Sequence, residues 1–169
     1  MSELVIAALE EGRADLFAAV DGLSDAQAVM RPAGNRWSAL EIVEHLVIVE
    51  ARFQGWINAG KELDAPLPDR DKEASLTNRV TDRTMKADAP EAVRPAGRFT
   101  TLAEGQDAFR KARDESVRMA QERGAELYSV GAEHPRFGPL NGIEVLYLLA
   151  GHGRRHATQI RENRVALGH

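Results

Sequence analysis

The sequence predicts an all-α protein, a four-helix bundle with one long crossover connection. Four segments repeat apolar residues at the spacing of an amphipathic helix, and three of them begin with a capping box. No segment alternates polar and apolar residues over a useful length, so we expect little or no β-structure. A chain of 169 residues can bury a substantial core, and we expect one domain over residues 1–169.

Start and stop signals delimit the four helices. The first stops at Gly22, and the other three follow the N-caps Ser38, Thr101 and Asn141. The predicted helices cover residues 2–21, 39–59, 102–124 and 142–167. We expect a short helical turn over residues 24–30 and a compact turn over residues 134–139, where glycine and proline interrupt the helical pattern.

Residues 61–100 form the crossover between the second and third helices. Prolines flank its middle part, and Leu76, Val80 and Met85 recur there at near-helical spacing. This spacing predicts one short helix over Asp71–Lys86. Because a structureless loop of about forty residues would be unusual in a compact domain, we expect the crossover to pack across one end of the bundle.

Composition excludes several classes of function. The net charge of −4 argues against a nucleic-acid-binding protein, which would usually present a basic face. The chain has no cysteine, so it has no disulfide, no thiolate metal ligand and no cysteine nucleophile. It shows neither a signal peptide nor an apolar run long enough to span a membrane, and we expect a soluble, cytoplasmic protein without a membrane partner.

Three of the five histidines are predicted to face the interior. His152 and His156 continue the apolar stripe of the last helix, and His45 lies on the apolar stripe of the second helix. His134 stands in a proline-containing loop, where we expect it to be solvated, and His169 is the terminal residue, to which we assign no role.

A divalent metal is one partner that satisfies all three buried imidazoles. A histidine pair at i and i+4 directs two ring nitrogens to the same side of a helix, and a histidine on a facing helix completes the set. Three neutral nitrogen ligands leave a fourth position for water or substrate, as in catalytic zinc sites. The alternative is that His45, His152 and His156 are core histidines with ordinary hydrogen-bond partners.

Two glycines, Gly151 and Gly153, flank His152 inside the last helix, and each costs about 1 kcal/mol relative to alanine. They remove bulk beside His152, which would let a neighbouring helix approach or leave room for a substrate. The alternative is that tertiary packing simply tolerates them.

Several polar residues near the histidines are candidates for supporting roles. Glu41 lies one turn before His45 and Gln159 three residues after His156, so either could contact a ligand histidine or a substrate. Glu44 and Glu50 are expected on the solvated side. The last helix also carries arginines, for which a solvated face and contact with an anionic substrate both remain open: Arg154, Arg155, Arg161 and Arg164.

Two motifs resemble those of the DinB/YfiT-like family. The segment 37–46, WSALEIVEHL, with Glu50 after it, is similar to the first signature, and the segment 152–160, HGRRHATQI, is similar to the second, H-x-x-x-H-x-x-Q-I. The stretch from Leu23 to Pro32 and the entry to the last helix at residues 134–141 also fit. The resemblance covers essentially the whole chain, although the glycine pair around His152 is less typical.

The resemblance implies an up-down-down-up bundle that is often dimeric. It also implies one divalent ion, commonly zinc or nickel, held by His45, His152 and His156. Family members include transferases that use a low-molecular-weight thiol, a thiol-dependent isomerase, and proteins described as metal-dependent hydrolases.

We therefore expect a metal-dependent enzyme that transfers such a thiol to an electrophile, or hydrolyses a small-molecule substrate. The alternatives are a non-catalytic bundle that binds a metal or small molecule, and a purely structural bundle. We expect the protein to form a homodimer and not to bind nucleic acid.

Overall fold

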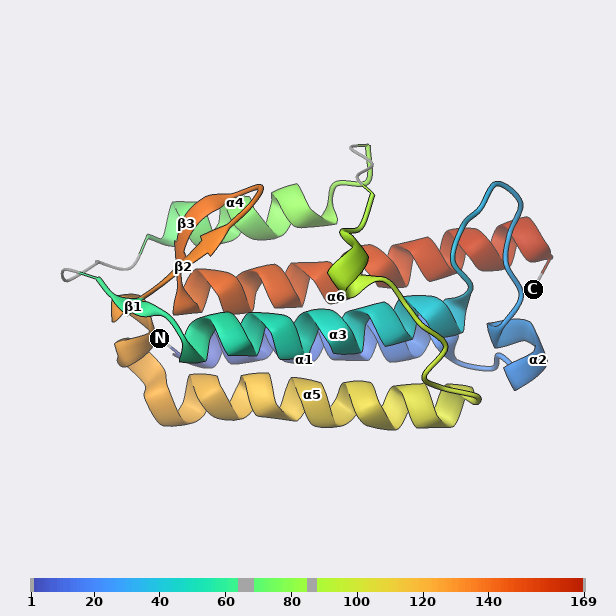
Figure 1. Cartoon of the computed structure of the whole chain (residues 1–169), viewed down its shortest axis with the longest axis horizontal. Helices are drawn as coiled ribbons and strands as arrows, with labels where there is room; N and C mark the ends of the chain where they lie inside the picture. Colours follow the sequence, from blue (N-terminus) through green and yellow to red (C-terminus); the bar gives the residue numbers. More distant parts are fainter. Residues whose placement is uncertain (1, 64–68, 85–87, 169) are drawn as a thin grey trace.

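A bundle of four long helices forms the body of the protein (Figure 1). The computed structural model describes residues 2–63, 69–84 and 88–168. The bundle helices are α1 (Ser2–Val20), α3 (Ala39–Asn58), α5 (Leu102–Arg123) and α6 (Gly142–Leu167). Helices α1 and α6 run in one direction and α3 and α5 in the other, which confirms the predicted up-down-down-up order.

The helix starts coincide with the predicted capping boxes. Ser38, Thr101 and Asn141 each accept a hydrogen bond from the backbone N–H three residues later, and the glutamate at that later position accepts from the cap backbone. An N-cap of this kind stabilises a helix by about 1 kcal/mol. The local sequence alone therefore specifies the first residue of three of the four bundle helices.

The connections carry the shorter elements. They are α2 (Asp25–Ala28), β1 (Lys61–Glu62), α4 (Arg70–Thr81), η1 (Glu91–Val93), η2 (Gly124–Ser129), β2 (Val130–His134) and β3 (Gly138–Asn141). The helix predicted over Asp71–Lys86 is α4, but it ends at Thr81, where Asp82 takes an extended conformation. Of the residues used to predict that helix, Met85 and Lys86 lie outside the described residues.

The expected packing of the crossover across one end of the bundle is wrong for α4. This helix lies alongside α6, on the outside of the bundle (Figure 1). Gly151 on α6 explains the close approach, because a Cβ there would lie 3.3 Å from both the Thr77 carbonyl oxygen and the Val80 Cβ. One of the two glycines beside His152 is therefore a packing site for a neighbouring helix.

The predicted turn over residues 134–139 is part of a β-hairpin. Strands β2 and β3 pair antiparallel, with Gly131 opposite Asn141 and His134 opposite Gly138, and β1 adds a third strand next to β2. The strands are short and include two glycines and a proline, so alternation is not visible in the sequence. Gly138 has φ +73°, which favours glycine at the turn.

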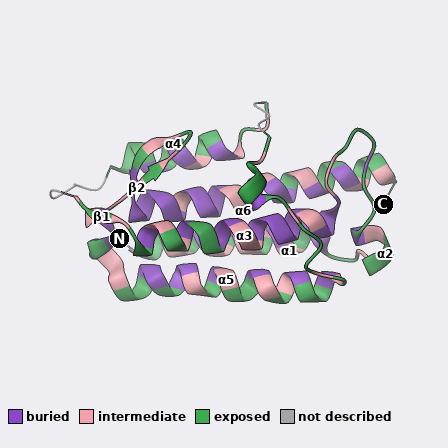
Figure 2. Cartoon of the chain, viewed as in Figure 1, coloured by how far each residue is buried: buried purple, intermediate pink, exposed green. Residues whose placement is uncertain are grey.

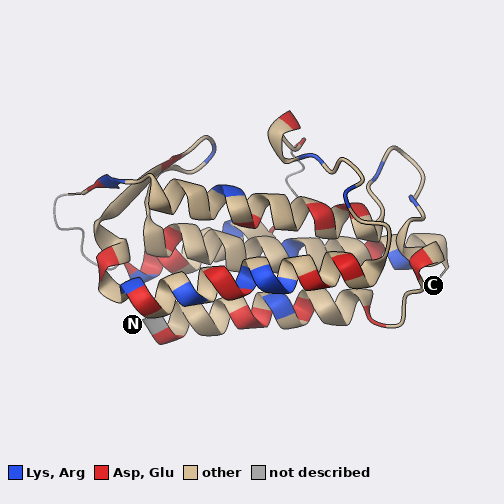
Figure 3. Ribbon diagram, turned by 60° about the horizontal axis from the view of Figure 1, so that its bottom comes forward, with Lys and Arg blue, Asp and Glu red and all other residues tan. Residues whose placement is uncertain are grey.

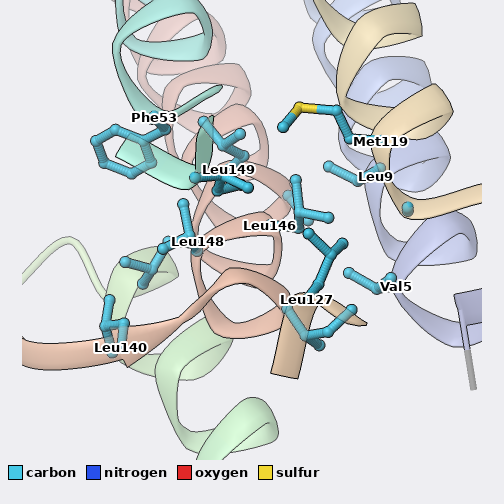
Figure 4. Packing of buried hydrophobic residues seen from close by; sticks show 14 of the residues in the cluster. Val5, Leu9, Phe53, Met119, Leu127, Leu140, Leu146, Leu148 and Leu149 are labelled. Atoms are coloured by element: carbon cyan, nitrogen blue, oxygen red, sulfur yellow. The ribbon is translucent and has the colours of Figure 1, made fainter. Parts of the chain in front are cut away.

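Buried residues lie along the whole length of the bundle helices (Figure 2). The apolar ones form two clusters, one toward each end of the bundle. The cluster at the sheet end includes Leu9, Met119 and Leu146, which lie close together, and Phe53, which lies on the other side of it near Leu148 and Leu149 (Figure 4). The cluster at the other end includes Leu16, Ile42, Leu46, Phe109 and Ile160.

Buried polar side chains of α3 and α5, with glycines of α1 and α6 next to them, lie between these clusters. We call Gly12, Glu50, Arg113, Ser116 and Gly153 the central polar layer; all five are buried. The Arg113 guanidinium donates from Nε to Glu50 Oε1 (2.8 Å) and from its two terminal nitrogens to the carbonyls of Leu9 (2.7 Å) and Leu149 (3.0 Å). Ser116 Oγ donates to the second oxygen of Glu50 (2.6 Å). One side chain of α5 thus bonds to α1, α3 and α6.

The expectation that Glu50 is solvated is wrong, because its side chain is only 1% exposed. A buried carboxylate requires a charged or hydrogen-bonding partner, and Arg113 and Ser116 supply both. Arg113 lies four residues after Phe109 and three before Ser116, on the same buried side of α5.

Helices α1 and α6 touch at two glycines. A Cβ at Gly12 would lie 2.7 Å from the Ala150 carbonyl oxygen, and a Cβ at Gly153 would lie 3.2 Å from the Gly12 carbonyl oxygen. Gly153 therefore lets a neighbouring helix approach, which is one of the roles expected for the glycine pair.

We expect Arg113→Met to lower the free energy of unfolding by about 3–5 kcal/mol, because it leaves the Glu50 carboxylate buried without its partner. Replacing both residues, as Arg113→Met with Glu50→Leu, should recover most of that loss. Urea unfolding at pH 7 measures both values. A single variant as stable as the wild type would contradict the role given to the pair.

We expect Gly12→Ala to destabilise the protein by about 1–3 kcal/mol, since the new methyl group forces α1 away from α6. Gly55 on α3 is a matched control, because a Cβ there meets nothing within 4 Å. Gly55→Ala should instead stabilise the protein by about 1 kcal/mol through helix propensity. Equal effects of the two substitutions would show that the α1–α6 contact is not tight.

Candidate metal centre

Three histidines from two antiparallel helices meet beside the central polar layer. His45 comes from α3, and His152 and His156 come from successive turns of α6. One ring nitrogen of each lies within 4.8 Å of the others. His45 Nε2 is 3.4 Å and His156 Nε2 is 3.0 Å from His152 Nε2. The predicted cluster therefore forms, and its nitrogens converge as ligands of one ion would.

Hydrogen bonds fix the tautomers of two of these histidines. His45 Nδ1 lies 2.7 Å from the Val93 carbonyl oxygen, and His156 Nδ1 lies 2.8 Å from Gln159 Oε1. Both partners only accept, so each Nδ1 carries the proton and donates it. Each Nε2 is then left with a lone pair that points toward His152 Nε2.

The polar groups of the cluster are not all satisfied by one another. His152 has one ring proton when neutral, so its Nε2 can donate to at most one of the two facing lone pairs. Within the described residues, His152 Nδ1 is buried and has no hydrogen-bond partner. A divalent cation at the meeting point would accept all three lone pairs at once, so the residues present fit such an ion.

Burial keeps these imidazoles neutral. It lowers the pKa of His45, which the bond to Val93 only partly opposes. The pKa values of His152 and His156 are lowered well below the usual range, first by burial, then by the neighbouring histidines and the positive charge of Arg155. Neutral imidazole is the form that binds a metal, so no proton has to be removed near neutral pH.

The crossover closes one side of the cluster, and Glu44 holds it there. Val93 belongs to η1, and the backbone N–H groups of Ala96, Gly97 and Arg98 donate to the Glu44 carboxylate (2.7, 3.0 and 3.1 Å). Glu44 is therefore buried, and its expected solvated position is wrong. Glu44, which precedes His45 in sequence, thus fixes the segment whose Val93 carbonyl orients the His45 ring.

The two candidates for supporting roles lie in different surroundings. Gln159 contacts a candidate ligand directly, through His156 Nδ1. Glu41 lies at the start of α3, where its carboxylate accepts from the Ser38 backbone N–H (2.8 Å) and pairs with Arg31. Burial raises the pKa of Glu41, but the bonds and charge of Arg31 and Ser38 outweigh this and lower it overall.

The remaining histidines lie apart from the cluster. His134 is half-buried among aromatic rings, with ring centroids 5.7 Å from Phe53, 5.6 Å from Trp56 and 4.9 Å from Phe137. Its Nδ1 accepts from the backbone N–H of Arg136 (3.0 Å), so it is not the freely solvated side chain we expected. His169 lies outside the described residues.

The arginines of α6 differ in their surroundings. Arg154 is exposed, Arg161 pairs with Asp15, and Arg164 donates to the Ala19 carbonyl oxygen (3.0 Å). Arg155 is half-buried and donates to the carbonyl oxygens of Val80 and Asp82, at the end of α4.

Elsewhere on the bundle, charges of both signs are interspersed, as the face in Figure 3 shows. Within the described ranges, no helix is both long and apolar enough to cross a bilayer.

Val93 and Arg113 are the residues near the site that sequence reasoning missed. The contribution of Val93 is a backbone carbonyl, for which a sequence contains no signal. Arg113 could have been found from helical spacing, because it lies four residues after Phe109 and three before Ser116 and so shares their face of the helix.

Known proteins share this fold. The chain matches a solved structure of YfiT from Bacillus subtilis with a TM-score of 0.62 and 18% identity, over 99% of this chain and 87% of that one. YfiT is described as a probable metal-dependent hydrolase with an unusual four-helix bundle topology. At this identity the likeness supports the fold and says nothing further of activity.

A relative and a family profile extend the comparison. The uncharacterised protein YuaE of Bacillus subtilis (strain 168) is 24% identical over 152 residues, which is 90% of this chain and 92% of YuaE. The profile of the DinB superfamily matches residues 8–160, a span that includes His45, His152 and His156. The chain belongs to the DinB superfamily.

Proposed function

We propose that this protein is a metal-dependent enzyme in which His45, His152 and His156 hold one divalent ion, zinc or nickel. The ion would serve to activate a low-molecular-weight thiol for transfer to an electrophile, or water for hydrolysis of a small substrate. The convergence of the three Nε2 atoms supports this most strongly, since two of them are fixed as lone-pair donors.

A divalent ion in such a site supplies a Lewis acid that lowers the pKa of its remaining ligand or polarises a substrate group. The chain's own residues prepare the position. Val93 and Gln159 orient two imidazoles and hold the proton on their outer nitrogens. This support typically changes metal affinity by about 10–100-fold. Gln159 therefore acts as a positioning residue, whereas Glu41 contacts Ser38 and Arg31.

Thiol transfer and hydrolysis differ in the source of the nucleophile. The chain contains no cysteine, so a thiol would have to come from a small molecule. Hydrolysis is the activity suggested for YfiT. A non-catalytic binding protein would use the same three histidines, and it is distinguished by the absence of turnover with any electrophile.

The first test is the metal content of the purified protein. We expect about one divalent ion per chain in the wild type and none in the His152→Ala/His156→Ala variant, as a three-histidine site requires. Added zinc should raise the melting temperature of the wild type but not of the double variant, because binding stabilises the folded state. His134→Ala is the control and should keep its metal. A wild type that takes up neither zinc nor nickel would overturn the proposal.

The pH dependence of metal binding is a second test. Because the pKa values of all three histidines are lowered, their folded forms stay neutral below the ordinary value of 6.5. Affinity should therefore be lost only as the pH falls through those lowered values, and it should change by less than about tenfold between pH 7.5 and 6. Titration with Co²⁺, followed by its visible absorption, measures this. A steep loss already near pH 6.5 would show that the imidazoles titrate like exposed ones.

A further inference from the structure

The indole ring of Trp37 packs against the imidazole of His45. Trp37 is the residue just before Ser38, the N-cap of α3. The two ring centroids lie 4.9 Å apart, and the ring planes are tilted by 46°. The other rings close to His45 are those of His152 and His156, with centroids 5.1 and 4.9 Å away. Of the ring contacts among the described residues, only the one with Trp37 joins His45 to a residue that is not a candidate ligand.

A buried asparagine of α6 holds Trp37 in this place. Asn163 Nδ2 donates to the Trp37 carbonyl oxygen (2.9 Å), and Asn163 is only 3% exposed. Its other polar atom, Oδ1, is buried without a hydrogen-bond partner in the part of the chain that the structure describes. Because an unpartnered buried oxygen is unfavourable, apolar packing alone does not account for an asparagine at this position. The bond to Trp37 does.

The loop that carries Trp37 is fastened to α3 by Glu41. The Glu41 carboxylate accepts from the backbone N–H of Ser38 (2.8 Å), directly after Trp37, and from Nε of Arg31 (2.8 Å), at the far end of the loop. Between these two bonds Asn35 has φ +57°, a conformation that asparagine adopts more readily than most residues. The backbone on both sides of this turn is therefore fixed.

Two loops thus hold His45, and a glutamate of α3 fastens each of them. Glu44 binds the crossover, whose Val93 carbonyl oxygen accepts from His45 Nδ1 (2.7 Å). Glu41 binds the loop whose Trp37 ring packs on the imidazole. The hydrogen bond fixes which nitrogen carries the proton. A ring bonded through one atom can still rock about that bond, and the indole limits this motion.

Burial of apolar surface does not by itself explain Trp37. The residue is half-buried, at the edge of the apolar cluster that contains Leu16 and Ile42. An aromatic ring stabilises a core through the area that it removes from water, and here part of that area stays in solvent. The apolar surroundings of a metal site also control the access of water and the local dielectric constant. A ring packed against a candidate ligand serves that purpose.

We propose that Trp37 is a positioning residue of the candidate metal centre. Its indole, set in place by Asn163 and Glu41, keeps the His45 imidazole aligned with its Nε2 toward the other two histidines and shields that imidazole from water. The inference rests on the proposed function, because it assigns Trp37 to the binding of the ion. It also gives Glu41 an indirect role, through the loop, in place of the direct contact considered from the sequence.

Substitution of the ring tests this through the affinity for Co²⁺, followed by the visible absorption of the bound ion. Trp37→Leu should weaken Co²⁺ binding by about tenfold, the lower end of the range for residues that support a metal ligand. Trp37→Phe should restore most of the affinity, because a flat ring again lies against His45.

Trp56 provides the matched control, because it is the other tryptophan of the chain and is also half-buried. It lies on the same helix as His45 but about three turns away, stacked on Phe53 with ring centroids 4.6 Å apart. Trp56→Leu should therefore lose packing without changing the affinity for Co²⁺. Urea unfolding of each metal-free variant measures the loss of packing separately.

Asn163→Leu tests the support of Trp37 while the indole stays in the chain. Leucine has the branching of asparagine, but it cannot donate to the Trp37 carbonyl oxygen. We expect its affinity for Co²⁺ to fall, by less than in Trp37→Leu.

The outcomes separate the two proposals. Wild-type affinity in Trp37→Leu, or an equal loss in Trp37→Leu and Trp56→Leu, would overturn the positioning role and leave the proposed function standing. If Trp37→Leu does not fold, an unchanged affinity in Asn163→Leu overturns the role, and a reduced one supports it. If the wild type itself binds no Co²⁺, the proposed function fails together with the inference.

Discussion

The buried guanidinium of Arg113 is the constraint on which the rest of the bundle depends. Its charge can be tolerated only where Glu50 and two backbone carbonyls meet it, and those groups belong to α3, α1 and α6. The apolar clusters on either side have no directional preference, so they could fill the bundle in several registers. The Arg113 bonds favour one register, because sliding any helix by a turn would leave a buried charge or carbonyl without a partner.

This register of the helices also determines the positions of the three histidines of the candidate metal centre. Leu149, whose carbonyl accepts from Arg113, lies one turn before Gly153, and Gly153 contacts α1 where Gly12 leaves space. His152 is held between these two points on α6. On the facing helix, Glu44 fixes the crossover and His45 donates to Val93 within it. The candidate metal centre therefore lies beside the rigid middle of the bundle. The residues that orient its ligands also stabilise the fold.

The sequence predicted features that follow from local patterns. Capping boxes located three helix starts, and helical spacing placed His45, His152 and His156 on inward faces. The sequence could not predict contacts between residues that are far apart along the chain and meet only in the folded protein. The carbonyl of Val93 has no side-chain signature, and Glu44 and Glu50 appeared solvated because their partners lie far away in sequence, at residues 96–98 and at Arg113. The hairpin was missed because its strands are too short for alternation to be visible.

Charge connects the central polar layer with the proposed chemistry. The three candidate ligands are neutral, and the charges that act on them, from Arg113 and Arg155 on His152 and from Arg155 and Arg83 on His156, are positive. A divalent cation added to such a site has no protein carboxylate among its ligands to balance it. The remaining position then favours a ligand that brings a negative charge over one that stays neutral. An ionised nucleophile and an anionic substrate both meet that requirement, so the surroundings that keep the histidines neutral also favour the ionised state of the molecule that reacts.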